Sequence, residues 1–122
     1  MNTRKRTTSR RKPALDIAKM SNQADKAETL LKAMASTPRL MVLCYLTEGE
    51  KAVWELLDEI QLSPSALSQH LAILREQGLV TARRQGQAIY YALNEGPALD
   101  IIGVLYTTYC KATRSRRPRK KR

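Results

Sequence analysis

The stretch that most constrains the fold is residues 62–80, which contain both a helix start and a helix stop. Ser63 suits an N-cap because its hydroxyl can accept a hydrogen bond from a free backbone N–H, and Pro64 suits the first helical position. Gly78 is typical of a helix end. Between these signals, apolar residues at i, i+4 and i+7 predict one buried stripe, made of Leu67, Leu71 and Leu74.

The opposite side of this helix is polar, and a basic hairpin follows it. The polar side carries short groups that can approach base edges, namely Ser65, Ser68, Gln69 and His70. Residues 80–84 and 87–93 alternate like strands around a tight turn at Gln85 and Gly86. The hairpin adds Arg83, Arg84 and Gln87. A winged helix contacts DNA with such an arrangement, so double-stranded DNA is the predicted partner.

Three further helices precede this unit, and one follows the hairpin. Helical periodicity spans residues 15–35, and Thr37 with Pro38 marks the start of a second helix that is apolar nearly all round. A third helix over residues 53–60 forms a helix-turn-helix with the helix over residues 64–76. The predicted fold is mainly α with a β-hairpin wing, in the order α-α-α-α-β-β-α.

The two outer helices have distinct apolar faces. The first helix is predicted to turn five residues inward, namely Ala24, Ala27, Leu30, Leu31 and Met34. The last helix, over residues 97–112, has an apolar face broader than a small domain needs on a terminal helix, made of Leu99, Ile102, Leu105, Tyr106 and Tyr109. We interpret this face as a dimer contact rather than as a cover for the core.

The positive charge is concentrated at the two ends. The chain has 122 residues and a net charge of +11, with six Lys or Arg in residues 1–12, eight in residues 111–122, and no acid in either segment. The middle has eight basic and eleven acidic residues, a net charge of −3. We therefore predict one domain over residues 15–112, between a disordered basic arm at 1–14 and a disordered basic tail at 113–122. Such arms add DNA affinity that is independent of sequence.

Several classes of protein are disfavoured by this composition. No apolar run approaches membrane-spanning length and the N-terminus lacks an apolar signal core, so we expect a cytoplasmic protein without a membrane partner. A single histidine, no glycine-rich phosphate loop and no carboxylate cluster make an active site hard to assemble, so we expect neither an enzyme nor a cofactor.

Together these motifs resemble the ArsR-type winged-helix repressors. The resemblance covers about residues 24–110 and depends on Leu67-Ser68-Gln69-His70-Leu71, Gly78-Leu79-Val80, Arg83-Arg84-Gln85-Gly86-Gln87 and Tyr90-Tyr91. It implies a symmetric homodimer built from the first and last helices, an operator DNA and an inducer. Ala52 departs from the family, which often has a Ser or Thr N-cap before the third helix; losing such a cap costs about 1 kcal/mol.

The expected DNA contacts follow from the chemistry of the side chains. Gln69 can pair with adenine, and Ser65 and Ser68 can contact bases or phosphates. His70 can donate to guanine or phosphate, and Ser63 lies at the start of the same helix. One of two adjacent wing residues, Arg83 or Arg84, should reach a phosphate or the minor groove, because side chains alternate along a strand and the two cannot point the same way.

The inducer is not expected to be a metal. Metal-sensing relatives carry thiol ligands in the third helix, or His and carboxylate ligands along the last helix. Here residues 53–58 contain no Cys, and residues 97–111 contain no His. Zinc needs about four converging ligands, so neither family site can be assembled.

Cys44 and Cys110 provide a different candidate for the inducer site. Taken singly, Cys44 is typical of a small buried residue and Cys110 of an ordinary helix end. Together they resemble the dithiol subgroup of the family, the BigR and SqrR type, whose members sense persulfides and related reactive sulfur. The resemblance implies that the dithiol form represses, and that a persulfide leads to a Cys44–Cys110 disulfide or polysulfide bridge.

Two other functions fit the same sequence. One is a nucleoid-type or RNA-binding protein that uses the winged helix and its basic arms without an inducer. The other is a redox-responsive activator or antirepressor with the same thiols. The sequence alone does not fix the sign of regulation.

Overall fold

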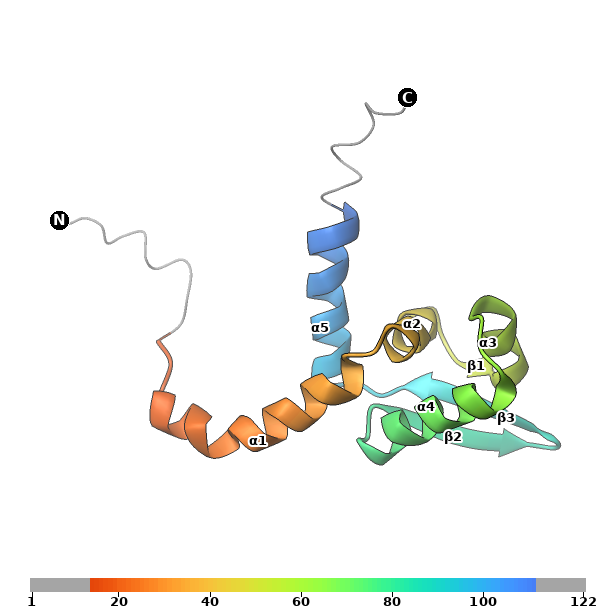
Figure 1. Ribbon diagram of the computed structural model, residues 1–122, viewed down its shortest axis with the longest axis horizontal. Helices are drawn as coiled ribbons and strands as arrows, with labels where there is room; N and C mark the ends of the chain where they lie inside the picture. The colour runs from red at the N-terminus through yellow and green to blue at the C-terminus, as the bar shows by residue number, and fades with distance from the viewer. Residues whose placement is uncertain (1–13, 112–122) are drawn as a thin grey trace, which may run out of the picture.

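A computed structural model describes residues 14–111 and has the predicted order of four helices, a hairpin and a fifth helix (Figure 1). The elements are α1 (Ile17–Met34), α2 (Thr37–Leu46), β1 (Lys51–Ala52), α3 (Val53–Glu59), α4 (Pro64–Glu76), β2 (Val80–Gln85), β3 (Ala88–Leu93), α5 (Pro97–Tyr106) and a π-helical turn, η3 (Thr107–Lys111). The winged helix-turn-helix prediction is confirmed. The predicted arm and tail lie outside the described residues, apart from Ala14.

The core is centred on the leucine stripe of α4. The largest fully buried side chains come from α2, α3, α4 and the first wing strand, namely Val42, Leu43, Leu56, Leu67, Leu71, Leu74 and Val80. Burying a leucine contributes about 2 kcal/mol, so this packing fixes α4 against the domain. The polar side of α4 consequently faces away from the core.

The wing belongs to a small antiparallel sheet with the strand order β1-β3-β2. Strand β1 was not predicted from the sequence; its two residues pair with Tyr90 and Tyr91 of β3. A strand this short has no periodicity of its own and is defined by its partner. The hairpin turn lies at Gly86 and Gln87, one residue later than predicted, with Gly86 at a φ of 62°.

The end of α4 is fixed by a glycine cap. Gly78 has a φ of 74°, which favours glycine, and its N–H donates to the Arg75 carbonyl at 2.9 Å. The Leu79 N–H donates to the Leu74 carbonyl at 2.9 Å, which completes a Schellman motif. The Asn94 side-chain amide donates to the Gly78 carbonyl at 2.7 Å. The end of α4 is therefore joined directly to the end of the wing.

Helices α1 and α5 project from this core (Figure 1). Within α1, Ala33 and Met34 are the buried residues. The prediction that Ala24 and Leu31 face inward is wrong for the single protomer, because both are exposed. The amphipathic pattern of α1 does correspond to an apolar face, but most of that face is too far from the protomer's core to pack against it.

The last helix also differs from the prediction of one helix over residues 97–112. Its α-helical part ends at Tyr106, and Thr107–Lys111 forms the π-helical turn. Two adjacent β-branched residues, Thr107 and Thr108, are poor α-helix formers and lie where the change occurs. Cys110 thus lies on a π turn, a feature that is often found at functional sites.

Candidate nucleic-acid interface

The polar side of α4 is presented as the sequence predicts. The Ser63 hydroxyl accepts a hydrogen bond from the Ala66 N–H at 3.1 Å, so it caps the helix, and Pro64 is the first helical residue. Ser65, Ser68 and Gln69 are all exposed. Because the opposite stripe is fully buried, α4 is rigidly held while these polar groups remain accessible.

His70 differs from its neighbours because it is half-buried and already has a partner. Its Nδ1 lies 3.2 Å from Nη1 of Arg39 on α2. A guanidinium group can only donate, so Nδ1 is the acceptor and the ring proton is on Nε2. The Nδ1 atom is therefore engaged within the protein.

Arg83 is held inside the wing. Its guanidinium donates to the Glu50 carboxylate at 2.9 and 2.7 Å, donates to the Gln85 side chain at 2.6 Å, and lies over the Tyr90 ring. The hydrogen bonds from Arg83 lower the pKa of Glu50, so the pair stays ionised at neutral pH. Since Glu50 directly precedes β1, Arg83 ties all three strands together.

The adjacent Arg84 is exposed. Across residues 14–111, no hydrogen bond or ion pair engages its side chain. Gln87 is exposed at the tip of the wing. The structure thus distinguishes Arg83, which is hydrogen-bonded within the wing, from Arg84, which is exposed. The sequence alone does not show this difference.

The start of α3 keeps only one half of a capping box. The Ala52 N–H donates to the Glu55 carboxylate at 2.7 Å, and the Ala52 side chain is fully buried beside β3. The other half is missing, because Ala52 has no side-chain oxygen to accept from the N–H of Glu55. Trp54 is 61% exposed on α3.

The two cysteines lie in one region of the protomer. Cys44 is partly buried on α2, and Cys110 is exposed on the π turn; both are free thiols. Burial raises the pKa of the Cys44 thiol, and the nearby charge of Cys110 raises that pKa further. The fold therefore places Cys110 within electrostatic range of Cys44, although the two residues are 66 positions apart in the sequence.

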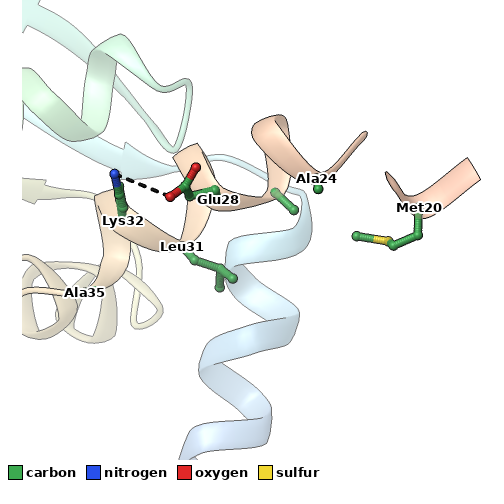
Figure 2. A pocket seen from close by; sticks show the side chains of 7 residues that line it. Met20, Ala24, Glu28, Leu31, Lys32 and Ala35 are labelled. Carbon is green, nitrogen blue, oxygen red and sulfur yellow. Dashed lines mark ion pairs between the residues drawn. The ribbon is translucent and has the colours of Figure 1, made fainter. Parts of the chain in front are cut away.

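An apolar surface runs along α1. A shallow cavity of about 420 Å³ follows one side of the helix, where Met20, Ala24 and Leu31 are aligned, with the Glu28–Lys32 ion pair at its edge (Figure 2). On the last helix, Val104, Tyr106 and Tyr109 are more than half exposed. Both projecting helices thus present apolar side chains outward.

Within residues 14–111, no group of three or more His, Cys, Asp or Glu side chains is gathered as a metal site would require. No helix in the same range is both long and apolar enough to cross a membrane.

Comparison with known proteins identifies the family. Residues 37–82 match the family described as bacterial regulatory protein, arsR family. Over 98 residues, the chain is 43% identical to the transcriptional activator HlyU of Vibrio cholerae, which covers 80% of this chain and 91% of that relative. The chain belongs to the ArsR family.

Other ArsR relatives agree in sequence and in structure. The biofilm growth-associated repressor of Xylella fastidiosa is 38% identical, over 81% of this chain and 87% of that relative. The crystal structure of the repressor BigR from Xylella fastidiosa superposes with a TM-score of 0.73 at 38% identity, covering 79% of this chain and 98% of that chain. These named relatives are transcriptional regulators and not enzymes, as expected for this chain.

Proposed function

We propose that this ArsR-family regulator is a cytoplasmic homodimer that binds a roughly palindromic operator and represses, and that it releases the operator when reactive sulfur links Cys44 to Cys110. The observation that carries the proposal is the pair of free thiols, Cys44 on α2 and Cys110 on the exposed turn after α5. Burial raises the pKa of the Cys44 thiol and the charge of Cys110 raises it further, which supports a link between them.

In this proposal α4 enters the major groove. Gln69 pairs with an adenine edge, while Ser65 and Ser68 contact bases or phosphates. Ser63 can still donate its hydroxyl proton to a phosphate while it caps the helix. His70 makes no base contact in this proposal, because its Nδ1 already accepts a hydrogen bond from Arg39.

On the wing, Arg84 rather than Arg83 contacts the DNA backbone. Arg83 would have to leave Glu50 to do so, whereas Arg84 has no competing partner in the described part of the chain. Gln87 contacts the groove edge from the wing tip. These phosphate contacts set the position of α4, and the α4 side chains provide the sequence preference.

The homodimer is supported by the exposed apolar residues of α1 and α5. Met20, Leu31, Val104 and Tyr106 are between 49% and 64% exposed in the protomer. Apolar surface of this extent on two projecting helices is typical of an interface. A two-fold dimer would place two copies of α4 in successive major grooves on one face of a palindromic site.

The sulfur chemistry follows from the exposure of the two thiols. The exposed Cys110 thiolate attacks the outer sulfur of a small persulfide, R–S–SH, which gives Cys110–S–SH and releases the thiolate R–S⁻. The Cys44 thiolate then attacks Sγ of Cys110, which forms the disulfide and releases HS⁻. The dithiol is oxidised and the persulfide sulfur is reduced; each additional bridging sulfur consumes one more persulfide and releases one more thiol.

The link regulates DNA binding only if the bridged state binds DNA less well. A tenfold loss of affinity requires about 1.4 kcal/mol of differential binding. The bridge would pull the turn after α5 toward α2, and α2 packs against α4. A change in the orientation of α5 at the dimer interface is therefore able to alter the position of α4.

The direct test compares wild type with Cys44→Ser and Cys110→Ser. Fluorescence anisotropy measures binding to a duplex selected from a random library, before and after treatment with glutathione persulfide. Wild type should release the duplex, and both variants should retain it. Release by either variant would contradict the dithiol mechanism and leave the DNA-binding proposal intact.

Two alternatives are each favoured by one observation. The net charge of +11, concentrated in the two ends, favours a nucleoid-type protein without an inducer. Footprinting separates this possibility, because a regulator protects one short symmetric site whereas an architectural protein spreads along the duplex. The similarity to a transcriptional activator favours a redox-responsive activator or antirepressor, which transcription from the selected operator in vitro distinguishes.

A further inference from the structure

One arginine of α2 contacts two other helices, α1 and α4. Arg39 lies in the first turn of α2 and reaches back to the end of α1. Its Nε donates to the Ala33 carbonyl at 2.7 Å, and its Nη2 donates to the Lys32 carbonyl at 3.3 Å. Carbonyls in the last turn of a helix lack partners within the helix, and a cation there also interacts favourably with the helix dipole. Arg39 therefore acts as a C-terminal cap for α1.

The third contact of Arg39 leads to α4. Nη1 donates to Nδ1 of His70 at 3.2 Å, across 31 positions of sequence. His70 lies among the polar residues of α4, one position after Gln69. The guanidinium thus joins the carbonyl end of the projecting helix α1 to the helix that carries the expected base contacts.

Side-chain packing fixes α1 to the core only at its C-terminal end, where Ala33 and Met34 join the same buried cluster as the α4 leucines. Figure 1 shows that α1 is attached to the rest of the protomer through its C-terminal end, where Ala33 and Met34 are buried. Beside this attachment lies an open cavity of about 230 Å³, with Thr29 of α1, Arg39, and Ile73 of α4 in its walls. The rigid fork of Arg39 therefore adds a polar link beside the packing of Ala33 and Met34 at this junction.

We propose that Arg39 is a positioning residue that acts through Nδ1 of His70 to set the angle between α1 and α4, and thereby the separation of the two α4 helices in the dimer. This inference rests on the proposed DNA-binding homodimer. It gives His70 a role inside the protein, in which Nδ1 matters and Nε2 does not.

Two substitutions at His70 separate its two ring nitrogens. His70→Asn places an acceptor oxygen where Nδ1 lies and removes Nε2, whereas His70→Gln keeps a polar group near Nε2 and removes the acceptor at Nδ1. Binding is measured by anisotropy on the duplex selected by wild type. His70→Asn should bind within about twofold of wild type, and His70→Gln should lose about tenfold, as expected for a lost charged hydrogen bond. The reverse order would show that His70 acts as a DNA contact and would overturn the inference.

A spacing assay then tests positioning directly. The selected duplex is compared with versions in which the half-sites are moved closer or further apart by one base pair. Wild type should discriminate by about tenfold, and His70→Gln and Arg39→Lys should discriminate by less than about threefold. The single nitrogen of a lysine side chain cannot span three acceptors that Arg39 reaches through Nε, Nη1 and Nη2. Far-UV circular dichroism at the assay temperature confirms that each variant is folded.

The outcomes of these assays are distinguishable. If both variants are folded and keep the wild-type spacing preference, the positioning role is wrong. If Arg39→Lys does not fold, His70→Gln alone decides the result. If wild type selects no short symmetric duplex, the proposed function itself fails.

Discussion

The two neighbouring wing arginines make a matched pair for testing the DNA interface. Arg84→Gln and Arg83→Gln remove the same charge from adjacent positions of β2. The structure predicts different results, because Arg83 is hydrogen-bonded to Glu50 and Gln85 while Arg84 is exposed. Arg84→Gln should remove one phosphate contact from each protomer, and Arg83→Gln should remove none.

The magnitude follows from counterion release. Log K falls with log salt with a slope of about −0.9 for each phosphate contact. Each lost contact therefore makes the slope about 0.9 less steep, and two lost contacts in a dimer make it about 1.8 less steep. The affinity ratio of wild type to Arg84→Gln should then be about sixtyfold at about 100 mM salt, and should fall about twelvefold between about 50 and 200 mM.

Anisotropy titrations of the selected duplex at four salt concentrations measure both slopes. Arg83→Gln should keep the wild-type slope. The double variant Glu50→Gln with Arg83→Gln, which leaves the net charge unchanged, controls for the released carboxylate. Equal slopes for Arg84→Gln and Arg83→Gln would refute the division between a DNA-contacting and a structural arginine.

Two further predictions concern α4 and the thiols. Gly78→Ala should lower the free energy of unfolding by about 1 kcal/mol. Alanine is strained at a φ of 74°, whereas its methyl group would meet no neighbour within 4 Å, so the strain is the only cost. Urea denaturation measures this loss, and an unchanged midpoint would contradict it. The rate at which iodoacetamide alkylates Cys44 should still be rising as the pH passes 9.0. Burial and the charge of Cys110 raise the pKa of this thiol, and only the thiolate reacts. In Cys110→Ser the alkylation midpoint should move to lower pH but stay above 9.0, because burial remains; a midpoint that does not move would mean that Cys110 exerts no charge effect on Cys44.

The features that the sequence predicted well are local. Ser63, Pro64 and Gly78 define the bounds of α4 through caps that involve residues a few positions away. The features that it missed join distant segments. Strand β1 exists only by pairing with β3, and the partners Glu50 and Arg83 are 33 positions apart.

The outward face of α1 illustrates a different limit. Its periodicity indicates that Leu31 belongs to an apolar side, but not whether that side packs on the same protomer or on another. The expected DNA contacts show the same limit, because alternation indicates that one wing arginine faces away from the other. Within residues 14–111, Arg84 is the free one because the fold brings the Glu50 carboxylate next to Arg83.

The central claim is that linking the two thiols within one protomer loosens the hold on DNA. The most direct measurement follows a single sample of wild type during persulfide treatment, with non-reducing intact-mass analysis for the bridged fraction and anisotropy for the bound fraction. We expect the mass of the protomer to fall by two hydrogens, or to rise by the mass of the bridging sulfur, in step with release of the duplex. Full occupancy of the duplex by fully bridged protomers would contradict it.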